Sequence, residues 1–279
     1  MIDPRAAIGE VHLTISDLDR SLQFYQANLG FITHQRNDSV ARLGAGGRDL
    51  LVLVESKRAP RVHRTTGLYH FAVLVPSRAD LARALRRLVD RGTAMQGAAD
   101  HGVSEALYLA DPDGNGIEIY RDRPRAEWRY VDGALRMGAD PLDLDALLDE
   151  SRDSAYGLAV GTTIGHVHLH VSHLPDAERF YVDVLGFALM QRYGASAIFV
   201  SAGGYHHHIA LNTWAGVGAP QPPTGAIGLR HFEILLPDAR AVTTVVERLR
   251  STSVSMESVD GGVLVRDPAG NAMLLQPEG

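Results

Sequence analysis

The 279-residue sequence contains no cysteine, which excludes disulfides, thiolate nucleophiles and thiolate metal ligands. Any bound metal must therefore be held by imidazole and carboxylate groups, and the chain has 13 histidines to offer. No apolar run is long enough to cross a membrane, and the opening MIDPRAAIG lacks the pattern of a secretory signal. We therefore expect a cytoplasmic protein with no membrane partner.

The sequence also lacks an excess of positive charge. It has 27 Lys and Arg against 33 Asp and Glu, a net charge of -6, and no basic stripe. This balance argues against a nucleic acid as the main partner. The share of hydrophobic residues, 45%, is that of an ordinary globular protein, and the length leaves room for two domains.

What the sequence does contain is an internal duplication. IGEVHLTISDLDRSLQFYQANLGF at 8–31 matches IGHVHLHVSHLPDAERFYVDVLGF at 164–187. GLYHFAVLVP at 67–76 likewise matches GLRHFEILLP at 228–237. An Asp-Pro-x-Gly-Asn turn closes each copy, so the two halves, residues 1–121 and 161–279, are homologous.

Each half divides again into two units of the same plan. EVHLTI alternates polar and apolar residues like a half-buried strand, and Ser16 and Asp17 then predict a helix start and Gly30 its end. Two or three strands follow, and the second unit repeats the plan with a helix that begins after Ser77. The result is four βαβββ modules, at 8–56, 68–121, 164–214 and 229–277, here called modules 1 to 4. Residues 122–160 form a connector that is long for a mere linker.

Four such modules, with FY and LGF in the opening and DPDGNGIE in the closing segment, resemble the vicinal oxygen chelate superfamily. That superfamily includes glyoxalase I, extradiol dioxygenases and the bleomycin and fosfomycin resistance proteins. Within it, the chain is most similar to small bacterial catechol 2,3-dioxygenase-like proteins. The resemblance implies an α+β fold in which modules pair into two cupped mixed sheets, with metal ligands on the first and last strands of the modules.

The pairing of the modules decides which ligands meet. The candidate positions are Glu10, His70, His166 and His231 on first strands, and Glu118 and Leu274 on last strands. If modules 2 and 3 pair, one cup contains His70, His166 and Glu118, the two-histidine, one-carboxylate set expected for non-haem iron. Pairing of neighbours gives no such set. We therefore predict that modules 2 and 3 form the active cup, with Glu10 and His231 as less favoured ligands.

The resemblance also implies catalytic residues in these two modules. Tyr108, four residues before Pro112, and His101 match the family's substrate-contacting pair. In YHHHIAL (205–211) the family motif gives His207 the acid-base role, whereas strict strand alternation aims His206 and His208 into the cup. We favour His207, and both interpretations stay open. His168 is a further candidate for the pocket or the ligand set.

The function implied is that of an extradiol ring-cleaving dioxygenase, which uses Fe(II) and O2 on catechol or a substituted catechol. Mn(II) is an alternative metal, and we expect a homo-oligomer. A second hypothesis is a glyoxalase-type isomerase with Ni or Zn, in which His208 is a fourth ligand. A third, from another class, is a non-catalytic binding protein like the resistance proteins, although such binders need no metal triad.

Overall fold

The computed structural model describes residues 1–151, 157–252 and 254–278. Residues 152–156 of the predicted connector, and residues 253 and 279 of the second half, lie outside the described residues. By its internal contacts the chain divides into two compact units. One comprises residues 1–13, 60–69 and 165–279, and the other residues 14–59 and 70–164.

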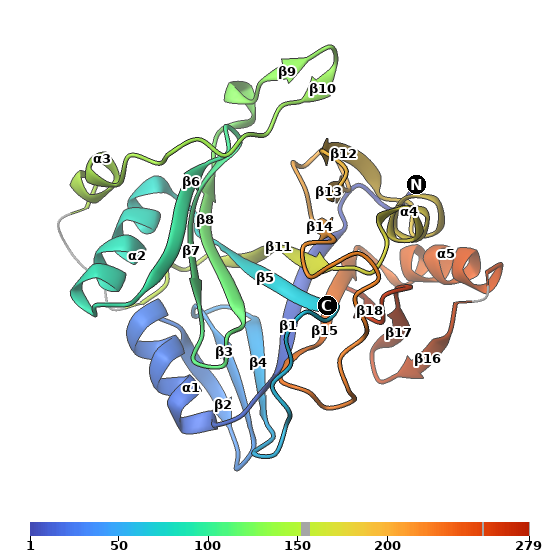
Figure 1. Cartoon of the computed structure of the whole chain (residues 1–279), viewed down its shortest axis with the longest axis horizontal. Helices are drawn as coiled ribbons and strands as arrows, with labels where there is room; N and C mark the ends of the chain where they lie inside the picture. Colours follow the sequence, from blue (N-terminus) through green and yellow to red (C-terminus); the bar gives the residue numbers. More distant parts are fainter. Residues whose placement is uncertain (152–156, 253, 279) are drawn as a thin grey trace. The chain divides into compact units, whose positions relative to one another are not determined.

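The four predicted modules appear in chain order, each with a strand, a helical segment and three further strands (Figure 1). The first comprises β1 (Ala7–Ile15), α1 (Leu18–Phe24), η1 (Tyr25–Leu29), β2 (Ile32–Arg36), β3 (Val40–Gly44) and β4 (Asp49–Glu55). The second comprises β5 (Gly67–Leu74), α2 (Arg78–Asp90), β6 (Met95–Asp100), β7 (Ser104–Ala110) and β8 (Gly116–Asp122).

The second half repeats this order after the connector. The described part of the connector holds η2 (Arg125–Glu127), β9 (Tyr130–Val131), β10 (Ala134–Leu135) and α3 (Leu144–Asp149). The third module comprises β11 (Thr163–His170), α4 (Leu174–Glu178), η3 (Arg179–Val184), β12 (Ala188–Tyr193), β13 (Ala197–Ser201) and β14 (Ile209–Asn212). The fourth comprises β15 (Gly228–Leu236), α5 (Ala239–Arg250), β16 (Met256–Val259), β17 (Gly262–Arg266) and β18 (Ala272–Pro277).

The fold class is the predicted one, because the strands form two eight-stranded mixed sheets. The first has the order β16-β17-β18-β15-β1-β4-β3-β2, and the second β12-β13-β14-β11-β5-β8-β7-β6. Strands of modules 1 and 4 thus make up the first sheet, and strands of modules 2 and 3 the second. Within each module the first strand runs parallel to the last where the register is defined, as in β5 with β8 and β15 with β18.

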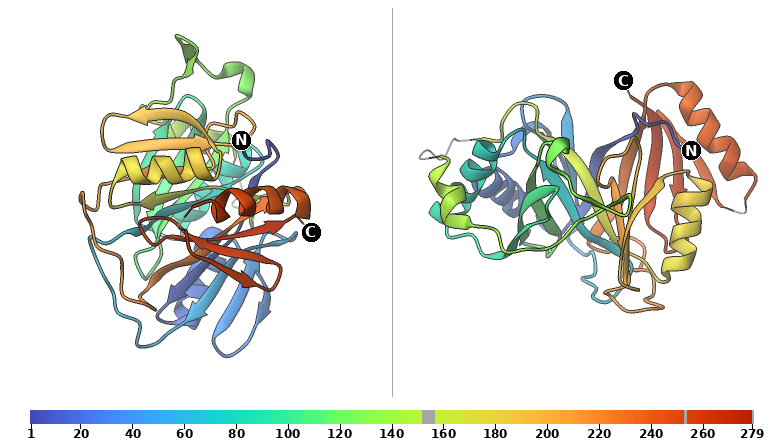
Figure 2. Two further views of the ribbon diagram at one scale, coloured as in Figure 1. Left: turned by 90° about the vertical axis from the view of Figure 1, so that its right-hand side faces the viewer. Right: turned by 90° about the horizontal axis from the view of Figure 1, so that it is seen from above.

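Helices α1 and α2 begin where a side chain accepts a hydrogen bond from an unpaired backbone amide of the first turn. The carboxylate of Asp17 accepts from the Arg20 amide, and the Ser77 hydroxyl accepts from the Asp80 amide, as the sequence predicts. The helical segment of module 1 differs from α2 in its last turn, η1, which is a π-helix. Gly30 ends this segment with a φ of 83°. Figure 2 shows helix α5 along the outer side of its own module's strands.

The Asp-Pro turns are tied to the π-helical segments of other modules. The Tyr25 hydroxyl donates to Asp111 at 3.0 Å, and the Tyr181 hydroxyl donates to Asp267 at 3.1 Å. Both tyrosines are fully buried. Each aspartate also accepts backbone amides of its own turn, so the turn that leads into the last strand is held in place from two sides.

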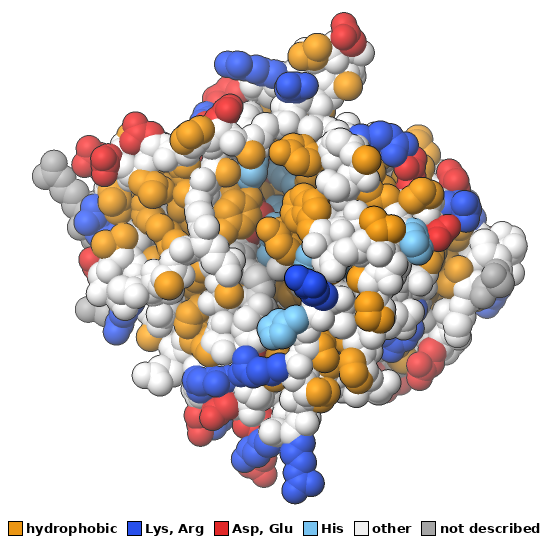
Figure 3. Space-filling model, in the orientation of Figure 1, with side chains coloured by type: hydrophobic (Ala, Val, Ile, Leu, Met, Phe, Trp, Pro, Cys, Tyr) orange, Lys and Arg blue, Asp and Glu red, His pale blue; other side chains and the backbone are white. Residues whose placement is uncertain are grey.

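The surface carries charges of both signs. On the face drawn in Figure 3, Lys and Arg side chains lie next to Asp and Glu side chains around the edge. Among the described residues, no helix combines the length and the apolar character needed to span a membrane.

Candidate active site

Strand alternation directs three potential ligands away from the helix-packed sides of their strands. On β5, Phe71 and Val73 are buried core residues, and His70 lies at the other parity. β8 runs parallel to β5 with Glu118 opposite Ala72. On β11, Val167 and Leu169 occupy the core parity, and His166 the other.

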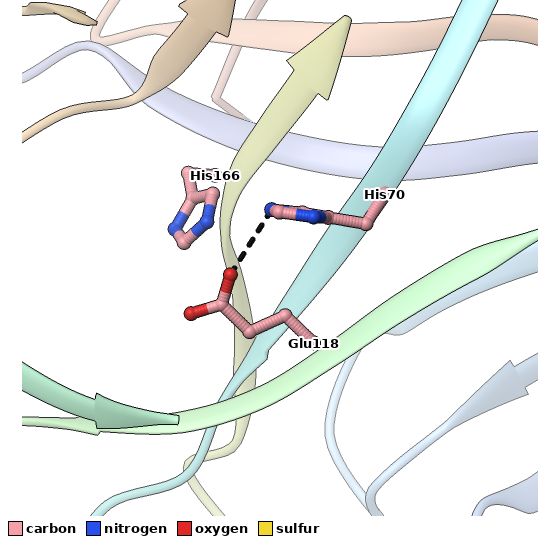
Figure 4. A group of neighbouring side chains, drawn as sticks. All are labelled: His70, Glu118 and His166. Atoms are coloured by element: carbon pink, nitrogen blue, oxygen red, sulfur yellow. Dashed lines mark ion pairs between the residues drawn. The ribbon is translucent and has the colours of Figure 1, made fainter. Parts of the chain in front are cut away.

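His70, Glu118 and His166 each offer one ligand atom, and these atoms all lie within 4.8 Å of one another (Figure 4). Nε2 of His70 lies 3.0 Å from Oε2 of Glu118. The three residues are 6%, 2% and 1% exposed, so a carboxylate is held almost entirely out of water beside two imidazoles. A buried carboxylate requires a compensating positive charge, and a divalent cation supplies one. The donor set therefore fits a metal ion that keeps open coordination positions.

The predicted substrate-contacting pair lies next to this carboxylate. Tyr108 is opposite Glu118 in the antiparallel register of β7 and β8, and its ring lies 5.7 Å from that of His70. The hydroxyl of Tyr108 is 2.6 Å from Nε2 of His101, whose Nδ1 is 2.6 Å from the carbonyl oxygen of Gly138. Because a carbonyl only accepts, Nδ1 of His101 carries the proton, and in the neutral ring Nε2 accepts from Tyr108.

The three consecutive histidines do not lie on a strand. β14 begins only at Ile209, so the expectation that strand alternation directs His206 and His208 into the cup is wrong. The preceding turn bends through Gly203 and Gly204, with φ of 59° and 68°, and a Cβ at Gly203 would lie 2.2 Å from the Pro4 carbonyl oxygen. Glycine is suited to both positions, because it adopts this left-handed conformation without strain.

In this turn the ring of His207 lies 4.1 Å from that of His166. Nδ1 of His207 is 2.7 Å from Nδ1 of His206, so the two rings share one proton along that contact. His208 makes different contacts, because its Nδ1 lies 3.0 Å from the Ser201 hydroxyl. His207 is therefore the member of the triplet whose ring lies closest to that of His166.

His168 is buried within an aromatic group rather than among the potential metal ligands. Its ring centroid lies 4.9 Å from that of Tyr69 and 5.2 Å from that of Trp214. Its Nε2 is 2.8 Å from the side-chain amide of Asn212. Tyr69 and Trp214 remain 40% and 46% exposed, so this group offers apolar ring surface at the protein exterior.

Glu10 and His231 belong to a second cluster. Glu10 lies with His12 and Glu233 in another set of ligand atoms that are all within 4.8 Å of one another, and the His231 ring stacks on His12 at 4.0 Å. Glu233 is not among the site residues predicted from the sequence. The available signal was positional, because Glu233 follows His231 by two residues as His12 follows Glu10.

Comparison with known proteins gives the family of the chain. The model of the Glyoxalase/Bleomycin resistance protein/Dioxygenase superfamily matches residues 7–119 and 163–274. The chain is 46% identical to catechol-2,3-dioxygenase of Bacillus subtilis (strain 168) over 273 residues, which cover 96% of this chain and 95% of the relative. The chain therefore belongs to this superfamily.

More distant similarities agree with the fold. Over 104 residues, 36% of this chain and 50% of the relative, the sequence is 33% identical to biphenyl-2,3-diol 1,2-dioxygenase 3 of Rhodococcus globerulus. A putative dioxygenase from Bacillus subtilis superposes with a TM-score of 0.63 at 13% identity, over 97% of this chain and 85% of that one. Glyoxalase I from Zea mays superposes with a TM-score of 0.59 at 15% identity, over 97% and 92%.

Proposed function

We propose that this protein is an extradiol ring-cleaving dioxygenase that acts on catechol or a substituted catechol. The observation that carries the proposal is the buried ligand set of His70, Glu118 and His166, with two imidazoles and one carboxylate. The 46% identity to a catechol-2,3-dioxygenase over nearly the whole chain supports the same activity. In this proposal the three side chains hold Fe(II), or Mn(II) in its place.

Fe(II) bound there would supply a Lewis acid with open positions for the two diol oxygens and O2. Three protein ligands on one side leave those positions available. Almost complete burial restrains the side chains of His70, Glu118 and His166. The substrate oxygens would therefore be held in a defined position beside these ligands. Orientation of this kind lowers the entropic part of the barrier.

His207 would act as the base that takes a proton from the diol. Its ring lies beside that of His166, and its Nδ1 contact with His206 sets which nitrogen carries a proton. With Nδ1 of His207 donating to Nδ1 of His206 along this contact, Nε2 is the unprotonated nitrogen of the neutral His207 ring, and it can take up a proton and give it back. The same nitrogen would return the proton when the ring bond has opened.

Tyr108 and His101 would orient the substrate oxygens. The Tyr108 hydroxyl donates to His101, so its oxygen lone pairs can accept a hydrogen bond from a diol hydroxyl. The Gly138 carbonyl holds the His101 ring by its other nitrogen and so fixes the direction of the phenol hydrogen. The aromatic group of Tyr69, His168 and Trp214 would contact a ring substituent.

The isomerase alternative requires His208 as a fourth ligand. Nδ1 of His208 instead contacts the Ser201 hydroxyl and the Ala202 amide, and His208 is not part of the group of close ligand atoms. These contacts favour the three-ligand dioxygenase over the four-ligand isomerase.

The proposal is tested by loading the full chain with Fe(II) without oxygen and adding catechol in oxygenated buffer. We expect uptake of one O2 per catechol and the yellow absorbance of a muconic semialdehyde, because both oxygen atoms enter the product. Parallel loading with Mn(II) identifies the active metal. Iron bound at one per chain with neither O2 uptake nor product from catechol or its alkylated forms would overturn the proposal.

A further inference from the structure

The first sheet carries a second group of ligand atoms, formed by Glu10, His12 and Glu233. Glu10 and His12 lie on β1, and Glu233 lies on β15, which is the neighbour of β1 in the sheet. Glu10 and His12 are two residues apart, so strand alternation turns both to the same side. The group thus joins the N-terminal strand to a strand more than 200 residues later in the chain.

We propose that Glu10, His12 and Glu233 form a second metal site, which binds a divalent transition-metal ion such as Zn²⁺ independently of the site proposed for catalysis. Imidazole and carboxylate are the ligands that this class of ion takes in the absence of cysteine.

The spacing of the donor atoms agrees with such an ion. Nε2 of His12 lies 3.0 Å from Oε2 of Glu10 and 3.9 Å from Oε1 of Glu233. For metal bonds of about 2.1 Å, two ligands of a tetrahedral ion lie roughly 3.4 Å apart. The two observed distances bracket this value, so small side-chain movements suffice to close the ligands on one ion.

The negative charge of the group also favours a bound divalent cation. Two carboxylates meet at a largely buried position, with 19% of the Glu10 side chain and 10% of the Glu233 side chain exposed. The ligand atoms of the two carboxylates lie within 4.8 Å of each other and largely out of water, so their negative charges repel each other. A protonated His12 would cancel only one of the two charges, whereas a divalent cation cancels both.

A hydrogen bond and a ring contact restrain two of the three side chains. The Glu10 amide donates to Oε2 of Glu233 at 2.9 Å, which orients that carboxylate. The His231 ring stacks on the His12 ring, with the ring centroids 4.0 Å apart. His231 therefore restrains the orientation of the His12 ring.

The internal duplication gives the group a counterpart in the second sheet. Glu10 and His231 occupy, in modules 1 and 4, the positions that His70 and His166 occupy in modules 2 and 3. Leu274 takes the place of Glu118, which leaves the first sheet without a ligand on its last strand. Glu233 supplies the missing carboxylate from a first strand, two residues beyond His231.

The test is the number of Zn²⁺ ions bound per full-length chain, measured by equilibrium dialysis and elemental analysis, together with the melting temperature. A Glu118→Gln chain removes a ligand of the other group, and we expect it to keep one tightly bound Zn²⁺. Adding Glu233→Gln should remove that ion and abolish the rise in melting temperature caused by Zn²⁺. Glutamine can still accept from the Glu10 amide, so the fold is expected to persist.

Glu247→Gln, at an exposed position on α5, is the matched control and should leave the ion bound. Equal Zn²⁺ binding by the Glu118→Gln chain with and without Glu233→Gln would overturn the proposal. A Glu118→Gln chain that binds no ion would also overturn it. If the catalytic proposal fails instead, the unaltered chain binds a single ion that Glu233→Gln removes and Glu118→Gln does not. The two proposals therefore fail in distinguishable ways.

Discussion

The hydroxyl of Tyr108 lies 2.6 Å from Nε2 of His101, and the carbonyl oxygen of Gly138 fixes the proton on the opposite nitrogen of that ring. In this arrangement the tyrosine donates to the histidine, and a phenol oxygen that donates its hydrogen can also accept one from a substrate hydroxyl. We expect Tyr108→Phe to lower kcat/KM for catechol about tenfold, equivalent to about 1.4 kcal/mol, because a single hydrogen bond is lost.

Metal content provides the check on this Tyr108 prediction. Tyr108→Phe should bind the same amount of iron as the unaltered protein, since the proposed ligands are His70, Glu118 and His166. A variant with unchanged kcat/KM would show that the Tyr108 hydroxyl does not contact the substrate.

His207 and His208 are the two candidate bases in the histidine triplet, and each assignment predicts a different effect of mutation. If His207 is the base, His207→Asn lowers kcat by about 10² to 10⁴-fold while iron binding persists. His208→Asn should then change kcat much less, because its Nδ1 contacts are with Ser201 and Ala202. Steady-state kinetics on iron-loaded variants decide between them, and a larger loss in His208→Asn would reverse the assignment.

The tyrosine that holds the second Asp-Pro turn contributes to stability. Tyr181→Phe removes a buried hydrogen bond to Asp267, and we expect a loss of about 1 to 2 kcal/mol in the free energy of unfolding. Urea titration followed by circular dichroism measures it. Tyr130→Phe, at an exposed position, is the control and should be neutral. An equal effect of the two changes would assign no stabilising role to the Tyr181 hydroxyl.

Burial of Asp267 makes its contribution to stability depend on pH. Burial raises its pKa above the ordinary value of 3.8, although hydrogen bonds from Asn271, Ala269 and Tyr181 oppose the rise. A carboxyl with a raised pKa in the folded state stabilises most below its unfolded pKa, and this contribution is lost as the pH rises through the folded value. The stability advantage of the unaltered chain over Asp267→Asn should therefore shrink as the pH rises from about 4. An advantage that grows over this range would contradict the raised pKa.

The module plan could be predicted because it rests on local signals that the fold does not override. Ser77 caps α2 and Gly30 ends the first helical segment, as their side-chain chemistry and conformational freedom require. The duplication then extends each local prediction to its counterpart, and the resemblance to the vicinal oxygen chelate superfamily added the two mixed sheets, which the structure confirms.

Other features could not be predicted because they depend on distant contacts. In the turn before β14, Gly203 closely approaches Pro4, nearly 200 residues away in the sequence. Glu233 gains its position beside His12 from the adjacency of β15 and β1, which no local pattern encodes. The ligand atoms of His70, Glu118 and His166, which the sequence grouped as one ligand set, lie within 4.8 Å of one another.

The central claim is that the buried carboxylate of Glu118 holds a catalytic Fe(II) together with His70 and His166. Its most direct test is iron content and catechol-dependent O2 uptake in Glu118→Gln, measured beside Glu127→Gln, which changes an exposed glutamate. We predict that Glu118→Gln loses O2 uptake together with tightly bound iron at this position, while Glu127→Gln keeps both. A Glu118→Gln protein that still cleaves catechol at the rate of the control would contradict the account.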